Sequence, residues 1–247
     1  MFQNIGEIIV LLWRTLRSLP LLWRQRAKVA DQLFEIGNAS LLMACILSIF
    51  IGGVITLEGG TVLAERGLSG VIGGFVGIAI CKELAPVMMA ILIAGRVGSA
   101  MAAEIGSMKV YQEIDALQTM NINPVHYLVL PRMVAISVAL PILVVFADLI
   151  GWIGGAAVAV SYHKIGIGFQ SFFNNLRDVV DGTDILHGLV KSYVFALVIG
   201  LVSCHQGLVT IGGPRGIGRS VTKAVVNSIV LILIANYFLT RVLLQID

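Results

Sequence analysis

Residues 82–132 read KELAPVMMAILIAGRVGSAMAAEIGSMKVYQEIDALQTMNINPVHYLVLPR, and this stretch indicates how the sequence on both sides of it is organised. It opens with two adjacent charges and a proline inside apolar sequence, continues with small residues, and becomes a short polar stretch that Pro124 closes. Long apolar sequence lies on both sides. This order predicts an amphipathic helix between two membrane-spanning helices, which is an element that a partner protein can contact.

The composition predicts a membrane protein. Of the 247 residues, 57% are hydrophobic and 13% are charged, and the mean hydropathy is +0.94. Soluble domains carry about twice that share of charge. Long continuous apolar runs favour helices over the short alternating strands of a membrane β-barrel. We therefore predict an all-α integral membrane protein with a single polytopic domain.

The apolar runs predict about five transmembrane helices. They cover approximately residues 39–57, 68–103, 133–160, 185–204 and 221–244, and Glu58, Gly59 and Gly60 are expected to end the first. The second run would form roughly 54 Å of helix, whereas a hydrocarbon core is ~30 Å thick. A bend near Pro86 is therefore expected. Residues 39–247 are assigned to the transmembrane domain and residues 1–38 to an N-terminal region.

The N-terminal region predicts a helix in the membrane interface. Its apolar residues recur at helical spacing: Ile5, Ile8, Ile9, Leu12, Leu16 and Leu19. Trp13, Arg14 and Arg17 flank this stripe, an arrangement typical of interfacial helices. The alternative is an ordinary amphipathic helix that packs on protein. A signal peptide is not favoured, because the two arginines stand where a cleavage site would be.

The distribution of basic residues predicts the orientation of the chain. Predicted loops on the N-terminal side carry Arg14, Arg17, Arg24, Arg26, Lys28, Lys109, Arg132, Arg215, Arg219 and Lys223. The opposite loops carry Arg66, Lys164 and Arg177. Cytoplasmic loops are the ones enriched in Lys and Arg. The N-terminus is therefore expected in the cytoplasm and the C-terminus outside.

The polar segment has an amphipathic pattern. Val110, Ile114, Leu117 and Met120 recur every three or four residues, and the other face includes Glu113 and Asp115. Ser107 is the predicted N-cap of this helix. The pattern fits a helix that docks on a partner and a solvated loop helix equally well.

Charges inside the predicted spans are candidate functional residues. Lys82 and Glu83 are adjacent, so on a helix they point roughly 100° apart. A charge at the centre of a span costs ~2.5 to 3.5 kcal/mol, so such residues usually face a cavity or a partner. Asp148 and Lys191 are candidate structural partners on other helices.

Small residues spaced by four predict close helix packing. Gly70 with Gly74, Gly73 with Gly77, Ala94 with Gly98 and Ala102, and Gly151 with Gly155 and Ala159 show this spacing. Such faces let helix backbones approach closely, within the bundle or between two copies of the chain.

Motifs for catalysis, metal binding and nucleic-acid binding are missing from the sequence. It has no GxxxxGK[ST] phosphate loop, no HExxH and no GxSxG. The four histidines are dispersed, so no metal site is predicted. The net charge of +3 is spread over the loops, which does not suggest nucleic acid as a partner. A non-catalytic protein without a cofactor of its own is expected.

Three stretches together resemble one family. Residues 82–132, GLVKSYVFALVIG at 188–200 and GIGRSVTKAVVNSIVLILIANYFLT at 216–240 resemble the MlaE/YrbE permeases of ABC transporters. The resemblance covers nearly all of the chain beyond about residue 30. It implies a homodimer in the bacterial inner membrane with a periplasmic C-terminus. It also implies transport of phospholipid between the inner and outer membranes, which maintains outer-membrane lipid asymmetry.

The same resemblance implies a set of partners. These are a cytoplasmic ABC ATPase that binds ATP and Mg, a hexameric MCE-domain protein outside the membrane and, in many systems, a STAS-domain subunit. The N-terminal helix resembles the elbow helix of the family, which implies a contact with the membrane anchor of the MCE-domain protein.

The resemblance also implies roles for individual residues. A cytoplasmic coupling helix that docks on the ATPase would include Ser107, Val110, Glu113, Ile114, Asp115, Leu117 and Met120. A lipid pocket would include Lys82, Glu83, Lys191 and Asn236. Many relatives carry Asp at the position of Asn236, so charge pairing there, for instance with Lys191, is in question.

Other functions remain open at this point. An ATP-independent secondary carrier or channel could use Lys82, Glu83, Asp148 and Lys191 as an ion path. A sterol or lipid importer of the mycobacterial or chloroplast kind shares the same family pattern. An intramembrane enzyme is disfavoured, because no pair of nucleophile and base is recognisable.

Overall fold

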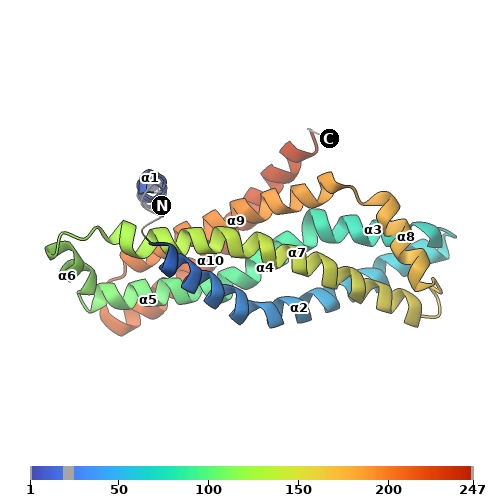
Figure 1. Ribbon diagram of the computed structural model, residues 1–247, viewed down its shortest axis with the longest axis horizontal. Helices are drawn as coiled ribbons and strands as arrows, with labels where there is room; N and C mark the ends of the chain where they lie inside the picture. Colours follow the sequence, from blue (N-terminus) through green and yellow to red (C-terminus); the bar gives the residue numbers. More distant parts are fainter. Residues whose placement is uncertain (1, 19–24, 246–247) are drawn as a thin grey trace. The chain divides into compact units, whose positions relative to one another are not determined.

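The computed structural model describes residues 2–18 and 25–245, and Figure 1 shows them as helices joined by short connections. No strand occurs within these residues. A helix satisfies its own backbone hydrogen bonds, which a segment surrounded by lipid requires. The predicted all-α membrane fold is confirmed.

Among the described residues, five helical segments are long and apolar enough to cross a membrane. They are α2 (Arg26–Glu65), the segment Ser69–Val110, the segment Val125–Ser161, α9 (Gly182–Leu208) and α10 (Gly213–Leu243). The third segment consists of a π-helical turn, η5 (Val125–Val129), and α7 (Leu130–Ser161). The remaining helices are α1 (Phe2–Ser18), α6 (Glu113–Thr119) and α8 (Phe169–Val179). The number of spans agrees with the prediction.

The second segment is interrupted by π-helical turns. It consists of η2 (Ser69–Val71), α3 (Ile72–Ala79), η3 (Ile80–Leu84), α4 (Ala85–Ile93), η4 (Ala94–Gly98) and α5 (Ser99–Val110). Of these, η3 and η4 are π-helical, and η3 directly precedes α4, which contains Pro86. Turns of this kind occur frequently at functional sites. The helix widens locally just before Pro86, and the bend expected at this position stays a prediction.

Several helices extend beyond the apolar runs. The prediction that Glu58, Gly59 and Gly60 end the first span was wrong, because α2 continues to Glu65. A side chain at Gly59 would meet the ring of Phe75, so this glycine provides space for a neighbouring helix. Likewise α10 begins at Gly213, well before the apolar run. Hydropathy locates the apolar centre of a helix, whereas its polar ends follow from backbone hydrogen bonding and packing.

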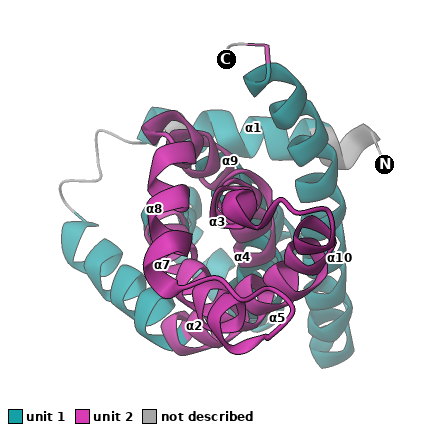
Figure 2. Ribbon diagram, turned by 90° about the vertical axis from the view of Figure 1, so that its right-hand side faces the viewer, with its two compact units in different colours: residues 1–39, 90–140, 193–244 teal, residues 40–89, 141–192, 245–247 magenta. Residues whose placement is uncertain are grey.

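The chain forms two compact units, coloured in Figure 2. The first unit comprises residues 1–39, 90–140 and 193–244, and the second comprises residues 40–89, 141–192 and 245–247. The core of the first unit includes Leu11, Ile105, Ile114, Val125, Leu128, Val129, Met133, Leu201 and Cys204.

Glycine contacts hold helices together in the second unit. A Cβ atom at Gly52 of α2 would overlap the carbonyl of Gly151 on α7. One at Gly73 of α3 would overlap the carbonyl of Phe172 on α8, and the backbone N–H of Gly74 donates to Asn175 Oδ1 at 2.6 Å. The predicted close packing through small residues is confirmed for these helices.

The N-terminal helix exists, and one of its faces packs on the chain. Leu11 is buried in the core of the first unit, and Ile8 and Leu12 pack against the same core. Ile9 and Trp13 are exposed. The alternative of packing on protein therefore holds for one face, and the apolar exposed face remains a candidate for the membrane interface. Leu19 of the predicted stripe lies outside the described residues.

Candidate functional site

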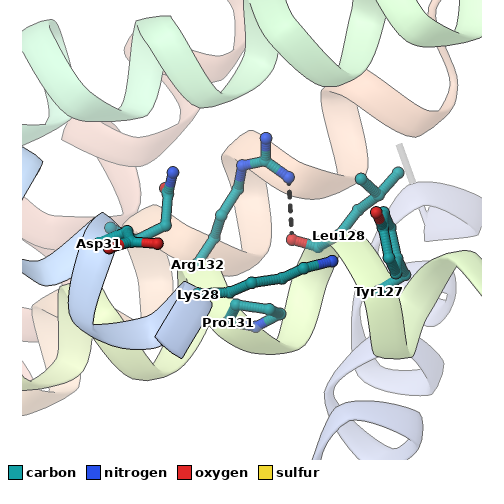
Figure 3. A pocket seen from close by; sticks show the side chains of 7 residues that line it. Lys28, Asp31, Tyr127, Leu128, Pro131 and Arg132 are labelled. Atoms are coloured by element: carbon teal, nitrogen blue, oxygen red, sulfur yellow. Dashed lines mark hydrogen bonds between the residues drawn. The ribbon is translucent and has the colours of Figure 1, made fainter. Parts of the chain in front are cut away.

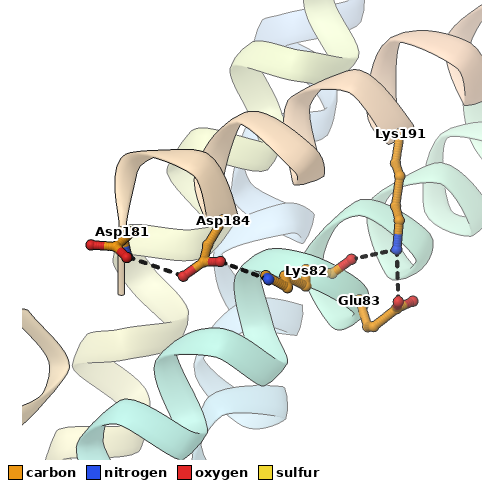
Figure 4. Close-up of polar contacts among 5 residues, drawn as sticks. All are labelled: Lys82, Glu83, Asp181, Asp184 and Lys191. Atoms are coloured by element: carbon orange, nitrogen blue, oxygen red, sulfur yellow. Dashed lines mark hydrogen bonds and ion pairs between the residues drawn. The ribbon is translucent and has the colours of Figure 1, made fainter. Parts of the chain in front are cut away.

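Two ion pairs join η3 to α9 within the second unit (Figure 4). Lys82 Nζ lies 2.8 Å from Asp184 Oδ1, and Lys191 Nζ lies 2.7 Å from Glu83 Oε1. The adjacent residues Lys82 and Glu83 therefore have different partners, as their divergent directions on a helix require. Three of the four predicted pocket residues come together here, and a fourth charge, Asp184, completes the group.

The spacing of the two partners on α9 matches this divergence. Asp184 and Lys191 are seven residues apart, so they lie on one face of α9 and are separated by roughly 10.5 Å along its axis. Lys82 can thus pair with Asp184 near the start of α9, and Glu83 can pair with Lys191 nearer its middle. Asp184 was missed because the sequence places it at the end of a polar loop. Its spacing of seven residues from Lys191 is the sequence feature that could have placed both residues on one face of the same helix.

A glycine lets η3 approach α9 between the two ion pairs. A Cβ atom at Gly188 would overlap the carbonyl oxygen of Cys81 and would lie 3.3 Å from Cγ of Pro86. Any larger residue would force the two elements apart. Because Gly188 lies midway between Asp184 and Lys191, this contact brings both partners within reach of η3.

Lys191 also compensates for a proline. In an α-helix the N–H of residue 86 would donate to the carbonyl of residue 82, but Pro86 has no N–H. Lys191 Nζ donates to that carbonyl of Lys82 at 2.8 Å. The ammonium group therefore binds both the Glu83 carboxylate and a backbone oxygen that the proline cannot satisfy.

Asp184 has a second role at the start of α9. Its Oδ2 accepts a hydrogen bond from the backbone N–H of Asp181 at 3.0 Å. Because α9 begins at Gly182, this is the reciprocal half of a capping box, in which a side chain in the first turn binds the backbone before the helix. The carboxylate that pairs with Lys82 is therefore held in position by the helix start.

Burial differs among the four charged side chains. Their exposed fractions are 2% for Lys191, 10% for Asp184, 25% for Lys82 and 40% for Glu83. A side chain that is removed from water can stay ionised when it is paired with an opposite charge and hydrogen-bonded. The four charges sum to zero. The buried cation of Lys191 pairs with the partly exposed anion of Glu83, and the mostly buried anion of Asp184 pairs with the partly exposed cation of Lys82. Lys82 and Glu83 thus present opposite charges at the surface of an apolar helical unit.

Asp148 belongs to neither of these ion pairs, but the Cys81 thiol of η3 hydrogen-bonds to its carboxyl group. It is buried on α7, and its Oδ1 atom has no hydrogen-bond partner among the described residues. The ion pairs of Lys82 and Lys191 instead use Asp184 and Glu83. The prediction that Lys191 is a structural partner across helices is confirmed by its ion pair with Glu83, and the contact between Asp148 and Cys81 agrees with a structural role for Asp148 as well.

Asn236 lies on α10 in the first unit, whereas Lys82, Glu83 and Lys191 belong to the second. Its inclusion in a common lipid pocket stays a prediction. Within residues 2–18 and 25–245, no group of three His, Cys, Asp or Glu side chains is arranged to hold a metal ion.

The predicted coupling segment contains two helices. The prediction that Ser107 caps a helix was wrong, because its carbonyl accepts the backbone N–H of Tyr111 at 2.9 Å and α5 continues to Val110. The chain then turns at Gln112, whose φ is 61°, and α6 begins at Glu113. Figure 1 shows α6 in the connection between α5 and α7. Glu113 and Asp115 lie in the first turn of α6, where negative charge favours the helix.

The apolar stripe of α6 faces partly inward. Ile114 is only 2% exposed and belongs to the core of the first unit, and Leu117 packs against that core. The expectation that a partner buries the whole stripe is therefore wrong for Ile114. Tyr111 and Met120 are exposed, as are both acidic residues of the first turn. These exposed residues form the surface that α6 offers.

Lys109 and Asp115 connect α5 with α6 at this surface, and their charged atoms are 2.9 Å apart. Both side chains are solvent-accessible, so the pair contributes little to stability. No cation pairs with Glu113 within the described part of the chain. Glu113 is therefore the acidic side chain of α6 that is available to a partner.

A small pocket separates the start of α2 from η5 and α7 (Figure 3). Lys28 Nζ lies 3.1 Å from the centroid of the Tyr127 ring, which is a cation–π contact. Arg132 donates to the carbonyl of Leu128 at 3.0 Å and pairs with Glu104 at 2.8 Å. These contacts fix the positions of the two basic side chains, and no sequence pattern predicts the pairing of Lys28 with Tyr127.

The N-terminal helix is fixed by a polar contact besides its apolar face. Glu7 Oε2 lies 2.9 Å from His205 Nε2, and His205 is buried on α9. Both residues line a hollow with Leu11 and Arg14 of α1. The contact fixes the position of α1 on the first unit.

Comparison with known proteins gives consistent matches. The profile of the family described as Permease MlaE matches residues 29–242. A probable ABC transporter permease protein of Synechocystis sp. is 38% identical over 220 residues, which cover 89% of this chain and 83% of that protein. A probable ABC transporter permease protein of Rickettsia typhi is 37% identical over 218 residues, covering 88% and 83%. The chloroplastic protein TRIGALACTOSYLDIACYLGLYCEROL 1 of Arabidopsis thaliana is 34% identical over 223 residues, covering 90% and 62%.

Proposed function

The chain belongs to the MlaE permease family of ABC transporters, and from this we propose that it moves phospholipid between the inner and outer membranes of a bacterium. Such transport would maintain the lipid asymmetry of the outer membrane. Family membership agrees with the resemblance carried by residues 82–132, 188–200 and 216–240. It makes this chain a multi-pass membrane protein and a permease subunit that works with an ATPase.

The pair of partly exposed charges, Lys82 and Glu83, supports a lipid cargo. They lie in a segment that is otherwise apolar enough to span a membrane. A phospholipid headgroup carries a phosphate and, in many lipids, an ammonium group. Lys82 is suited to the phosphate and Glu83 to the ammonium, while the apolar surface accommodates acyl chains.

ATP hydrolysis is assigned to the partner ATPase, which would bind ATP and Mg. The proposed contact on this chain is the exposed surface of α6 with Tyr111, Glu113 and Met120. The segment Ser69–Val110 leads directly from η3 to α6 along the chain. ATP-driven closure of the ATPase would move α6, and this movement would change the exposure of Lys82 and Glu83.

The proposed assembly contains a second copy of this chain, an MCE-domain hexamer and, where present, a STAS-domain subunit. The exposed apolar face of α1, with Ile9 and Trp13, is suited to the membrane interface and to a membrane anchor of the MCE-domain protein. The N-terminus would be in the cytoplasm, where α6 meets the ATPase, and the C-terminus in the periplasm.

A second cargo class is favoured by one relative. The name of the Arabidopsis protein refers to a galactosylated diacylglycerol lipid. Such a lipid has two acyl chains but no phosphate, so it would use the hydrogen-bonding capacity of Glu83 and would leave the charge of Lys82 unused. Phospholipid remains the preferred cargo because both charges are exposed together.

The test is ATP-dependent lipid transfer by the purified complex in liposomes. Fluorescent phosphatidylethanolamine, phosphatidylglycerol and digalactosyldiacylglycerol with identical acyl chains are compared. Transfer of a phospholipid that requires ATP and is lost with Glu83→Gln supports the proposal. Transfer that proceeds at the same rate without ATP contradicts it and favours a secondary carrier. Preference for the galactolipid favours the second cargo class.

A further inference from the structure

The start of α10 carries a basic face that the proposed transport does not use. Arg215, Arg219 and Lys223 are exposed and stand four residues apart, so successive side chains are offset by only about 40° around the helix. They line one groove together with Gly218 and Thr222. No acid pairs with these three cations within residues 2–18 and 25–245.

The same face continues as exposed apolar surface. The side chains that follow on it are Val226, Val230, Leu233 and Tyr237, with exposed fractions of 52%, 49%, 52% and 63%. The opposite face of α10 is the buried one, with Gly216, Ser220, Ala224, Ser228 and Ile232. The outer face of α10 therefore has three cations at one end and an apolar strip beyond them, within a segment that qualifies as a membrane span.

The dimensions of this face match one lipid molecule. From Lys223 to Leu233 the helix rises roughly 15 Å, which is about half of a ~30 Å hydrocarbon core and therefore one leaflet. Basic residues at the end of a span attract anionic headgroups. We propose that this face of α10 binds an anionic phospholipid of the surrounding membrane, with its phosphate on Arg215, Arg219 and Lys223.

Two features favour a lipid over other anions. A free phosphate would use the cations but would gain nothing from the apolar strip. An acidic surface of a soluble protein would leave the same strip uncovered. The proposed site goes beyond the transport function, because the bound lipid is a component of the bilayer and Lys82 and Glu83 do not contribute to it.

The experiment is native mass spectrometry of the full-length chain in mild detergent, titrated with dioleoylphosphatidylglycerol or dioleoylphosphatidylcholine. The wild type should bind the anionic lipid roughly tenfold more tightly or better, since each basic residue near the headgroup adds to the attraction. Arg215→Gln/Arg219→Gln/Lys223→Gln should remove this preference. Arg215→Lys/Arg219→Lys should keep it, because the charge is retained.

A matched control removes the same charge elsewhere. Arg66→Gln/Lys164→Gln/Arg177→Gln replaces three exposed cations of the second unit and should leave the preference intact. ATP-dependent lipid transfer by the triple glutamine variant of α10 is measured in parallel, and the Glu83→Gln transfer assay tests the proposed transport alone, so failure of this proposal and failure of the proposed transport are distinguishable.

Several results would overturn the proposal. Equal affinity of the wild type for the two lipids would do so, as would an unchanged preference in the triple glutamine variant. Full competition by glycerophosphoglycerol, which has no acyl chains, would show a site for free anions. If the triple variant loses the ATPase from the complex while its lipid preference persists, the face is a protein contact. If that variant does not fold, the wild type alone decides. Affinity for the anionic lipid that stays the same between about 50 and about 500 mM salt would contradict the proposal.

Discussion

Lys191 Nζ lies 2.7 Å from Glu83 Oε1 and 2.8 Å from the carbonyl oxygen of Lys82, while only 2% of the Lys191 side chain is exposed. One buried ammonium group thus binds a partly exposed carboxylate and the backbone oxygen that Pro86 cannot satisfy. It stabilises the π-helical turn and fixes the direction of Glu83. The carboxylate that we propose meets the cargo and the local fold therefore depend on the same cation.

Lys191→Met tests the structural part of this relationship. The change removes the donor to both oxygens, and a buried hydrogen-bonding group left without its partner costs about 1 to 3 kcal/mol. We expect a markedly lower midpoint of thermal unfolding in detergent. Glu83→Met/Lys191→Met should recover part of the loss, because no carboxylate is then left without its cation. An unchanged midpoint in the single variant would contradict the role of Lys191.

Glu83→Gln tests the functional part. The amide oxygen can still accept from Lys191, so the fold and the assembly with the ATPase should be retained. The negative charge that would meet an ammonium headgroup is lost. We expect phosphatidylethanolamine transfer to fall roughly tenfold or more, which corresponds to about 1.4 kcal/mol. Normal transfer with a normally assembled complex would show that Glu83 does not contact the cargo.

Gly188→Ala tests the close approach of η3 to α9. The added Cβ atom would overlap the Cys81 carbonyl and displace both ion pairs. Overpacking of this kind costs about 1 to 3 kcal/mol, so stability and transfer should fall together. Gly182→Ala is the matched control, because a Cβ atom there meets nothing within 4 Å. Equal behaviour of the two variants would argue against the contact.

Glu113→Lys tests the surface of α6. The substitution removes a favourable charge at the helix start, a cost of only about 0.3 to 1 kcal/mol, so the chain should still fold. We expect the ATPase to be lost from the purified complex, or its activity to become independent of transport. The control is Glu65→Lys at the exposed end of α2. Retention of a fully coupled ATPase in the Glu113 variant would remove α6 from the interface.

Much of the fold could be predicted from the sequence, because hydropathy and small-residue spacing depend on local composition. The five spans followed from hydropathy. The cost of charge in an apolar segment indicated that Lys82, Glu83 and Lys191 need partners, and the ion pairs bear this out. The partners of these charges could not be predicted, since they depend on the capping geometry of Asp184 and on the packing space at Gly188.

The structure of the segment around α6 also could be predicted only in part from the sequence. Its helical periodicity was visible, but the start of the helix was not. The α5 ladder continues through Ser107, and the reversal depends on the left-handed backbone of Gln112. Periodicity also does not show whether an apolar side chain faces a partner or the chain itself, and Ile114 faces the chain.

The most direct test of the central claim is mass spectrometry of proteins and lipids in the tagged complex, purified in mild detergent from the membranes of its own host. We predict an ABC ATPase, an MCE-domain protein and bound phospholipid, with the phospholipid reduced in the Glu83→Gln complex. A homo-oligomer that retains no ATPase, even after gentler extraction, and the same bound lipid in both complexes would contradict the account.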